Sequence, residues 1–440
     1  MFYLLAALLY LRFEHERRPR VYLLATLIFV IALLTKSVTA TLPAALLVVI
    51  WWRKARIDLR ADVLPLLPWF VLGAAMGLVS AHVEKVYVGA QGSEFDLTFV
   101  ERCLLAGRIA WFYIGKLIWP ADLIFIYPRW NVDAGVLWQW FFPAAVIVVL
   151  AFLWWLRRRT RAPLAAALFF GGSLFPTLGF FNVYAFMFSF VADHWQYLPS
   201  IGIVTLTAAA LATGLTRVGQ TPRTSRIIRV VLVAGLGVLT FQQSRMYADM
   251  FTFYATTLAR NPGAWMAHNN LGNMRRDGGD LESARRHFEA ALQVRPDLVK
   301  VHNNLANVLR EQRQFDEAEQ HYRRALELKS DYAEAHNNLG SLLRQRGKPA
   351  DAIPHLLQAV QIDPLYADAR NNLGVALREA GRLQDAIIQF ERVVKDAPKM
   401  AAGHLNLALT LSLVGRMNEA MEHYREARRL NPAIPELPMR

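Results

Sequence analysis

The stretch that decides the fold of the second half of the chain is Asn337-Asn338-Leu339-Gly340, which returns at a fixed interval of 34 residues. The Asn-Asn-Leu triplet occurs at 269–271, 303–305, 337–339 and 371–373, and it becomes Leu-Asn-Leu at 405–407. A glycine or an alanine follows every copy. Five aligned copies at one interval predict a repeat architecture rather than a single folded core.

Small and large residues also recur at fixed places within each copy. An alanine is followed four positions later by a large residue, which is Phe288, Tyr322, Leu356, Phe390 or Tyr424. Proline recurs near the end of each copy, at 262, 296, 364, 398 and 432, with Ser330 in the remaining one. Small residues let two helices approach closely, the large residue fills the space between them, and proline ends the second helix. The pattern predicts an α-solenoid of five tetratricopeptide repeats over 265–434.

The second asparagine of each triplet occupies one position on the first helix of its repeat: Asn270, Asn304, Asn338, Asn372 and Asn406. First helices line the concave side of such a solenoid, so these amides are expected to form a ladder along a peptide-binding groove. Each amide offers two N–H donors and one acceptor to the backbone of an extended peptide. The ladder resembles that of the O-GlcNAc transferases. The alternative is that the amides cap or bridge neighbouring repeats.

Histidines recur at the same interval, at 268, 302, 336 and 404, and Arg370 stands in the remaining copy. Adjacent repeats stack too far apart for consecutive histidines to share one metal ion comfortably. We therefore predict no metal site in the repeats. The whole sequence also lacks the Walker loop, the G-x-S-x-G and H-E-x-x-H motifs and paired cysteines, so any chemistry is expected in the first half.

The first half of the chain is apolar and carries nearly all of the formal net charge of +14. Residues 1–260 hold 24 Lys and Arg against 12 Asp and Glu, whereas residues 261–440 hold 25 against 23. Membrane topology explains a basic excess in an apolar region better than nucleic-acid binding does, so we predict no nucleic-acid partner. Cys103 is the only cysteine, which excludes an intrachain disulfide.

Eight apolar runs predict a polytopic α-helical membrane domain over 1–243. They lie at 1–13, 21–34, 38–52, 64–83, 137–156, 163–181, 199–216 and 227–242. A ninth stretch at 103–119 contains Arg108 and Lys116 and is expected to lie at the membrane interface. A linker helix or half repeat at 244–264 joins this domain to the repeats at 265–434, and a tail occupies 435–440.

The charges of the predicted loops give the topology. With this assignment sixteen basic residues and four acidic ones face one side, while the other side holds eight of each. The positive-inside rule makes the first side cytoplasmic. The last span then runs outward, which predicts an integral protein, of the bacterial inner membrane, with its repeats on the extracytoplasmic side.

Two predicted outer segments carry candidate chemistry. The segment 84–130 combines basic and aromatic residues, which suits contact with a lipid-linked phosphate; the alternative is an ordinary interfacial helix whose cations snorkel. The segment 193–200 begins Asp193-His194-Trp195. A carboxylate beside a histidine close to a bilayer is costly unless it is paired or hydrated, which indicates function. The alternative there is a helix cap and interfacial anchor.

At these residues the chain resembles the transmembrane and tetratricopeptide-repeat-containing O-mannosyltransferases and their bacterial relatives. The similar stretches are 35–43, beginning Thr-Lys-Ser, 111–130, ending Tyr-Pro-Arg-Trp, and 192–199, beginning Ala-Asp-His. The resemblance implies a GT-C membrane fold that transfers mannose from a polyprenyl-phosphate donor to extracytoplasmic protein acceptors. It allows a divalent metal and implies donor-phosphate or lipid-side contacts for seven residues: Lys36, Arg108, Lys116, Arg129, Asp193, His194 and Tyr197.

The sequence departs from this family at its beginning. Family members place a large outer loop with an acidic motif of the Trp-Asp-Asp type after their first membrane helix, and no such loop occurs here. We therefore expect an N-terminally shortened member with an incomplete GT-C-like domain, in which no catalytic residue can be named. Two functions stay open: a membrane-bound glycosyltransferase, and a non-enzymatic membrane-tethered scaffold for extracytoplasmic protein–protein interactions.

Overall fold

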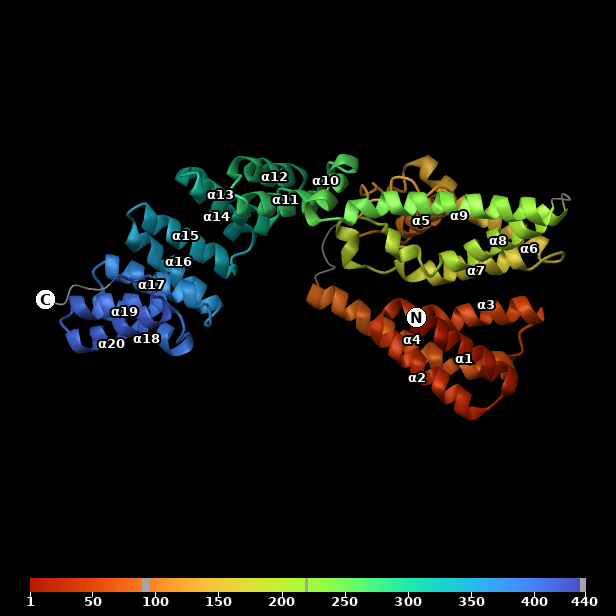
Figure 1. The fold of residues 1–440 in the computed structure, drawn as a ribbon, viewed down its shortest axis with the longest axis horizontal. Coiled ribbons are helices and arrows are strands. Elements are labelled where there is room, and N and C mark those ends of the chain that lie inside the picture. Colours follow the sequence, from red (N-terminus) through yellow and green to blue (C-terminus); the bar gives the residue numbers. More distant parts are fainter. Residues whose placement is uncertain (89–94, 218–220, 436–440) are drawn as a thin grey trace. The chain divides into compact units, whose positions relative to one another are not determined.

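The computed structural model describes residues 1–88, 95–217 and 221–435, and every regular element in these ranges is helical (Figure 1). The all-α class expected from the sequence is confirmed. The chain divides into two compact units, Met1–Ala264 and Trp265–Arg440. Of the predicted tail, residues 436–440 lie outside the described residues.

Four helices open the first unit: α1 (Phe2–Glu16), α2 (Pro19–Thr35), α3 (Leu42–Lys54) and α4 (Leu67–Val83). Short turns of 3-10 or π type connect them: η1 (Ser37–Thr41), η2 (Leu59–Val63), η3 (Leu64–Leu66) and η4 (Glu84–Val88). They enclose a hydrophobic cluster around the fully buried Trp69. The Trp69 ring stacks on Phe29, with ring centroids 4.4 Å apart, and meets Tyr10 edge-on at 5.1 Å. These aromatic contacts fix the packing of α1, α2 and α4.

A cluster of charged side chains joins the end of α1 to the end of α3 and to η2. The Lys54 ammonium lies 2.6 Å from the Glu14 carboxylate and 2.8 Å from that of Asp62. The side chain of Asp62 is only 1% exposed and that of Glu14 is 8% exposed. The last turn of α1, the last residue of α3 and η2 therefore meet in one place.

The rest of the first unit contains α5 (Phe99–Ile118), α6 (Phe141–Leu156), α7 (Ala162–Leu174), α8 (Ser200–Arg217), α9 (Pro222–Ser244) and α10 (Met250–Arg260). Short 3-10 turns lie between them: η6 (Leu137–Trp140), η7 (Phe175–Thr177), η8 (Tyr184–Met187), η9 (Asp193–Gln196) and η10 (Arg245–Tyr247). A second hydrophobic cluster surrounds Tyr113 of α5. The Tyr113 hydroxyl donates to the Ala192 carbonyl and accepts from the Ala192 N–H, both at 3.0 Å. These two hydrogen bonds to the backbone hold η9 against α5.

Four helical segments are long and apolar enough to cross a membrane: Leu59–Tyr87, Leu137–Leu156, Ser200–Arg217 and Arg223–Tyr247. They correspond to four of the eight predicted runs. The runs at 21–34 and 163–181 fall on shorter apolar helices. The runs at 1–13 and 38–52 form α1 and α3, and the stretch at 103–119 forms α5. The lengths of the four long helices are compatible with membrane insertion.

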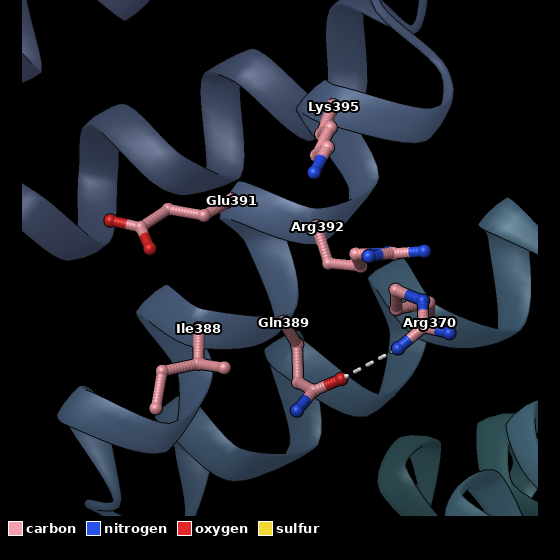
Figure 2. A pocket seen from close by; sticks show the side chains of 6 residues that line it. All are labelled: Arg370, Ile388, Gln389, Glu391, Arg392 and Lys395. Carbon is pink, nitrogen blue, oxygen red and sulfur yellow. Dashed lines mark hydrogen bonds between the residues drawn. The ribbon is translucent and has the colours of Figure 1, made fainter.

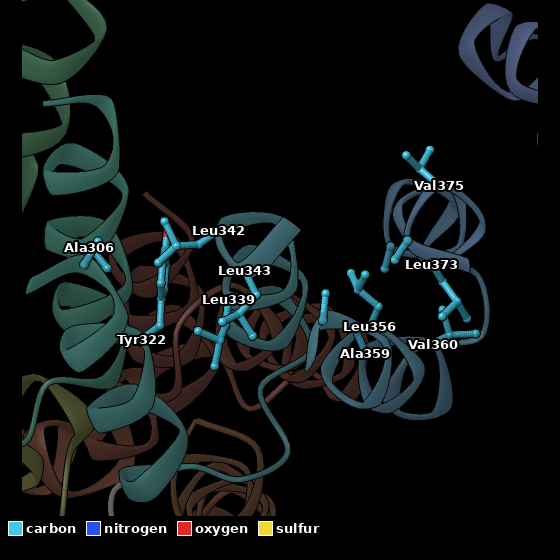
Figure 3. Close-up of a cluster of buried hydrophobic side chains, with 14 of the residues drawn as sticks. Ala306, Tyr322, Leu339, Leu342, Leu343, Leu356, Ala359, Val360, Leu373 and Val375 are labelled. Atoms are coloured by element: carbon cyan, nitrogen blue, oxygen red, sulfur yellow. The ribbon is translucent and has the colours of Figure 1, made fainter. Parts of the chain in front are cut away.

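The second unit is a solenoid of five helix pairs. The first helices are α11 (Trp265–Asp277), α13 (Val299–Glu311), α15 (Ala333–Gln345), α17 (Ala367–Glu379) and α19 (Ala401–Leu413). The second helices are α12 (Leu281–Val294), α14 (Phe315–Leu328), α16 (Pro349–Ile362), α18 (Leu383–Asp396) and α20 (Met417–Leu430). One hydrophobic cluster runs through the repeats, and part of it, from Tyr322 to Val375, is drawn in Figure 3. The solenoid therefore has a continuous core instead of one core for each repeat.

Candidate functional site

The first helices of the five repeats form a continuous layer, and this layer carries the candidate groove. Helix α11 contacts α13, α13 contacts α15, α15 contacts α17, and α17 contacts α19. Because each first helix meets the next one, residues at equivalent positions come into register along the solenoid. The five predicted asparagines follow this register.

Each predicted asparagine from the second repeat onward donates a hydrogen bond to the preceding repeat. Asn338 Nδ2 donates to Oδ1 of Asn303 at 3.0 Å, and Asn372 Nδ2 donates to Oδ1 of Asn337 at 2.8 Å. The same bond crosses the other two boundaries: Asn304 to Asn269 at 3.2 Å, and Asn406 to Asn371 at 2.9 Å. The bridging alternative that the sequence left open is therefore realised in the structure.

Bridging leaves some donors of the ladder amides unused, although Asn372 also donates to the Ser341 hydroxyl at 3.2 Å. The accepting residue Asn303 is fully buried, whereas the predicted residues Asn304 and Asn338 are half-buried. Each of these two uses one Nδ2 N–H in its bridge, and within the described part of the chain its other N–H makes no further hydrogen bond. The bridge thus fixes the orientation of an amide that still has donors to offer to a ligand. The first asparagine of each doublet was not predicted to take part, although its repetition is visible in the sequence.

A row of half-buried arginines lies on the same helices and was also missed: Arg276, Arg310, Arg344 and Arg378. Arg344 forms a two-point ion pair with Glu379 of the next repeat at 2.8 and 3.0 Å. Arg378 donates to the side-chain carbonyl oxygen of Asn406 at 3.3 Å. Among the described residues no carboxylate lies within ion-pair distance of Arg310. The groove layer therefore contains a cation that a peptide carboxylate or carbonyl could approach.

In the first unit, Asp193 is the centre of a second candidate site. Its Oδ1 accepts a hydrogen bond of 2.7 Å from the Tyr127 hydroxyl. Burial raises the pKa of the Asp193 carboxyl, while the bond from Tyr127 and the charge of Lys116 act in the opposite direction. Lys116 itself donates to the Ala121 carbonyl at 2.6 Å and lies over the Tyr127 ring at 5.5 Å. The structure thus gathers Lys116, Tyr127 and Asp193, of which Tyr127 was not predicted as a site residue.

Two further predicted residues, His194 and Lys36, act on each other through charge. The pKa of His194 is lowered by partial burial and then by the positive charge of Lys36. Lys36 is exposed and precedes η1, so this pair links the first and last stretches that carry the O-mannosyltransferase resemblance. Tyr197 is 71% exposed and presents its ring at the surface.

Two predicted cations lie against aromatic rings. The Arg108 guanidinium is 4.3 Å from the Trp130 ring centroid, 5.4 Å from that of Trp138 and 5.9 Å from that of Phe142. Arg129 lies 4.9 Å from the Phe190 ring. Cation–π contacts of this kind stabilise a positive charge beside an aromatic ring. The ring contacts of Arg108 are compatible with both interpretations of the 84–130 segment, a phosphate contact and an interfacial helix.

A polar pocket that the sequence did not reveal lies where α9 ends and α10 begins. It is lined by Gln242, Gln243, Arg245, Met246, Ala248, Thr252, Thr256 and Arg260. Arg260 and Gln243 both donate to the Leu123 carbonyl at 2.8 Å, which ties this pocket to the loop after α5. Thr252, Thr256 and Arg260 share one face of α10 because they are four residues apart. No run of apolar or charged residues marks such a pocket in the sequence.

The described residues contain no group of three His, Cys, Asp or Glu side chains that could hold a metal ion. The divalent metal that the resemblance allows therefore has no ligand set in these parts of the chain. Residues 89–94, which include the predicted outer residue Glu94, lie outside the described residues.

The matches to families of known proteins lie in the second unit. Residues 264–331 and 297–364 match a family model described as "Tetratricopeptide repeat", and residues 342–399 and 371–435 match another model of the same description. The tetratricopeptide repeats predicted from the sequence are thereby confirmed. No curated protein matches the chain.

Several solved structures are similar to the repeat region. YrrB, described as a TPR protein with an unusual peptide-binding site, is 23% identical over 41% of this chain and 93% of its own, with a TM-score of 0.36. MamA from Desulfovibrio magneticus RS-1 is 19% identical over 39% and 97%, with a TM-score of 0.36. PilW, a type IV pilus biogenesis factor, is 24% identical over 39% and 79%, with a TM-score of 0.37.

Proposed function

We propose that the protein is a membrane-tethered scaffold whose tetratricopeptide groove holds an extended segment of a partner protein on the extracytoplasmic side. The ladder of half-buried asparagines carries this proposal. Its amides are held in one orientation by bonds across the repeat boundaries, and Asn304 and Asn338 keep an N–H for a peptide carbonyl. Preorganised donors bind an extended backbone without the entropy loss of ordering each side chain on binding.

The test separates peptide binding from bridging, because Asn303 and Asn338 share one bridge but differ in exposure. The full chain in nanodiscs is screened against an array of 12-residue synthetic peptides, and the affinity for the best peptides is measured by fluorescence anisotropy. Asn303→Ala removes the buried acceptor, whereas Asn338→Ala removes the half-exposed donor. Asn418→Ala on the exposed face of α20 is the control.

A groove function requires that Asn338→Ala weakens binding by roughly tenfold, the equivalent of one lost hydrogen bond, while Asn303→Ala weakens it clearly less. Equal losses in both variants would make the amides purely structural. Absence of any peptide binding by the unaltered chain would remove the proposal.

We propose as the second candidate that the first unit is a GT-C-like glycosyltransferase using a polyprenyl-phosphate sugar, completed by an acidic loop supplied from elsewhere. The cluster of Lys116, Tyr127 and Asp193 supports it, because a half-buried carboxylate with a cation and a hydroxyl beside it is typical of functional sites. The polar pocket where α9 ends and α10 begins contains Arg245 and Arg260, which could hold a phosphate.

Transfer is tested by incubating the nanodisc protein with radiolabelled polyprenyl-phosphate mannose and a peptide selected on the array. Product formation that is lost in Asp193→Asn and kept in Arg12→Gln, a change at an exposed residue of α1, would support the enzyme. If the peptide binds but no sugar is transferred, the scaffold proposal stands and the glycosyltransferase proposal is refuted.

A further inference from the structure

Four of the five repeats contain a pair of histidines that joins their two helices. The sequence shows the histidine of the first helix, and its partner stands 19 residues later on the second helix. The two Nδ1 atoms face each other in every pair: His268–His287 at 3.1 Å, His302–His321 at 2.9 Å, His336–His355 at 3.2 Å and His404–His423 at 3.2 Å. The fourth repeat replaces the pair by Arg370 and Gln389.

The geometry of these pairs is that of a hydrogen bond. The Nδ1 atoms of His302 and His321 are 2.9 Å apart, and their ring centroids are 5.2 Å apart. The centroid separation exceeds the Nδ1–Nδ1 separation by twice the distance from a ring centre to its own Nδ1. Both nitrogens therefore lie on the line that joins the two ring centres. The other three pairs have centroid separations of 5.4, 5.5 and 5.4 Å and share this arrangement. Two lone pairs aimed at each other over so short a distance leave room for a proton and none for a metal ion.

The other ring nitrogen of the first-helix histidine determines where this proton belongs. Nε2 of His302 lies 3.0 Å from the Pro296 carbonyl, and Nε2 of His404 lies 3.1 Å from the Pro398 carbonyl. His336 makes the same bond with Ser330 at 3.1 Å. A carbonyl only accepts, so Nε2 of these histidines carries the hydrogen and their Nδ1 is an acceptor. The second-helix histidine must then donate from Nδ1, which leaves its own Nε2 free to take a proton.

The first added proton and the second one have opposite effects on such a pair. A proton on Nε2 of His423 creates an imidazolium whose Nδ1–H still donates to His404, and this bond becomes charge-assisted and stronger. A second proton would occupy the Nδ1 of His404, so that two N–H groups and two positive charges face each other. Like charges this close cannot both persist without a large pKa separation.

We propose that each histidine pair is a site for one proton. On acidification the solenoid gains one positive charge for each pair with its helices still joined, and the joints open only when a second proton enters. Burial lowers the pKa of His287, His355 and His423 and brings that of His321 to about 4, which keeps the first proton off these rings at neutral pH.

Neighbouring charges set the order in which the pairs load. The groups that face them are Arg275, Arg286 and Asp280 at the first pair, Arg285, Arg324 and Glu289 at the second, Arg323 and Glu319 at the third, and Glu391, Glu419, Glu422 and Glu426 at the fifth. The fifth pair has the largest excess of carboxylates, because its four carboxylates are offset only by Arg416 and Arg429, which pair with Glu419 and Glu426. It therefore takes its proton at the highest pH, and loading begins at the C-terminal end of the solenoid.

The fourth repeat supplies the control. Arg370 donates to the Gln389 side-chain carbonyl at 3.2 Å, drawn as a dashed line in Figure 2, and to the Pro364 carbonyl at 2.9 Å. Arg370 and Gln389 thus make the same two hydrogen bonds as a histidine pair, but neither side chain titrates between pH 4 and 8. The double variant His404→Arg, His423→Gln should therefore keep the helices of the fifth repeat joined and lose its proton uptake.

The experiment is solid-state nitrogen NMR of the full chain in nanodiscs, labelled at histidine and titrated from pH 8 to 4. The proposal expects one Nδ1-protonated and one Nε2-protonated ring for each pair, then a single imidazolium for each pair, appearing first in the signals that the double variant removes. His15→Gln, on an exposed histidine outside the repeats, should remove no pair signal.

Three results would overturn the proposal. In the first, both rings of one pair become imidazoliums at the same pH. In the second, both rings of a pair carry their hydrogen on Nε2 at neutral pH. In the third, Zn²⁺ alone at equimolar concentration shifts the signals of the paired Nδ1 atoms. The last outcome would identify the pairs as metal sites.

Discussion

Gly374 in α17 lies directly against the ring of Phe390 in α18, so closely that a Cβ atom on residue 374 would stand 2.5 Å from Cε1 of the ring. The same relation holds between Gly340 and Leu356, at 2.5 Å. These contacts explain why a small residue and a large residue recur together in the repeats. They also give the first prediction.

Gly374→Val should destabilise the solenoid by about 1–3 kcal/mol, because the added methyl groups force the Phe390 ring or the helix backbone to move in a fully packed core. Guanidinium unfolding of the nanodisc protein, followed by circular dichroism, measures the loss. Gly77→Ala in α4 is the matched control, since a Cβ atom there meets nothing within 4 Å. Equal stability of the two variants would contradict the packing argument.

The second prediction concerns the buried ionic cluster of Lys54, Glu14 and Asp62. Lys54→Met removes the nearest cation of two buried carboxylates, which keep only Arg53, 3.4 Å from Glu14, and Arg17, 3.9 Å from Asp62. Loss of one member of a buried ionic group costs up to about 3–5 kcal/mol. Thermal unfolding followed by tryptophan fluorescence should show a large fall in Tm. Arg12→Gln, which breaks the exposed pair with Glu16, should leave Tm nearly unchanged. A similar small effect in both variants would mean that water replaces Lys54.

The third prediction concerns the Tyr127–Asp193 bond. Because burial raises the pKa of Asp193 above its ordinary 3.8, the folded state binds this proton more tightly than the unfolded state does. The ionised carboxyl therefore costs stability above its folded-state pKa, and this cost disappears as the pH falls below 3.8. Asp193→Asn should stabilise the first unit at pH 7 and flatten its acid-side profile. Tyr127→Phe should destabilise it at pH 7 by about 1–3 kcal/mol, since the carboxylate loses its donor.

Thermal unfolding of both variants at pH 7 and pH 4 measures these effects, with the exposed Tyr197→Phe as the control. A destabilised Asp193→Asn at pH 7 would show that the charge of Asp193 contributes favourably, contrary to this account.

The fourth prediction concerns pH and the second repeat. The folded-state pKa of His321 is about 4, below its ordinary 6.5, so the unfolded chain takes up this proton first during acidification. The stability that the neutral ring contributes is fully present above pH 6.5 and is lost as the pH falls from 6.5 to 4. His321→Gln should reduce the pH dependence of unfolding in this window. Hydrogen exchange of α14 amides at pH 7 and 4.5 gives the readout, and an unchanged pH dependence would contradict the assignment.

The repeats could be predicted from the sequence because each packing requirement of a repeat is met by a particular type of residue, which recurs at a fixed interval. A glycine such as Gly374 and a ring such as that of Phe390 form a pattern that the spacing of residues alone makes visible. The position of the asparagine ladder followed from the same register. Its bond pattern did not, because the accepting Asn303 and the donating Asn338 belong to different repeats, and only their three-dimensional stacking shows which atom meets which.

The first unit was harder to predict in detail. Apolar length identifies the helices that could cross a membrane. The contacts of a single residue such as Tyr127 depend instead on how the chain folds back over 66 residues to Asp193. The histidine pairs were missed for a related reason. His321 falls on the second helix, and a search for metal ligands across repeats overlooks a partner within the same repeat.

The single cysteine of the chain makes its topology directly measurable. Cys103 lies in the second turn of α5 and is partly exposed. No other thiol competes with it, so the unaltered protein can be labelled at one known site without first removing cysteines. A maleimide that cannot cross membranes, added to intact cells and then to inverted vesicles, reports which face of the membrane α5 begins on. Labelling from the outside would place α5 on the side where the charge pattern puts the repeats.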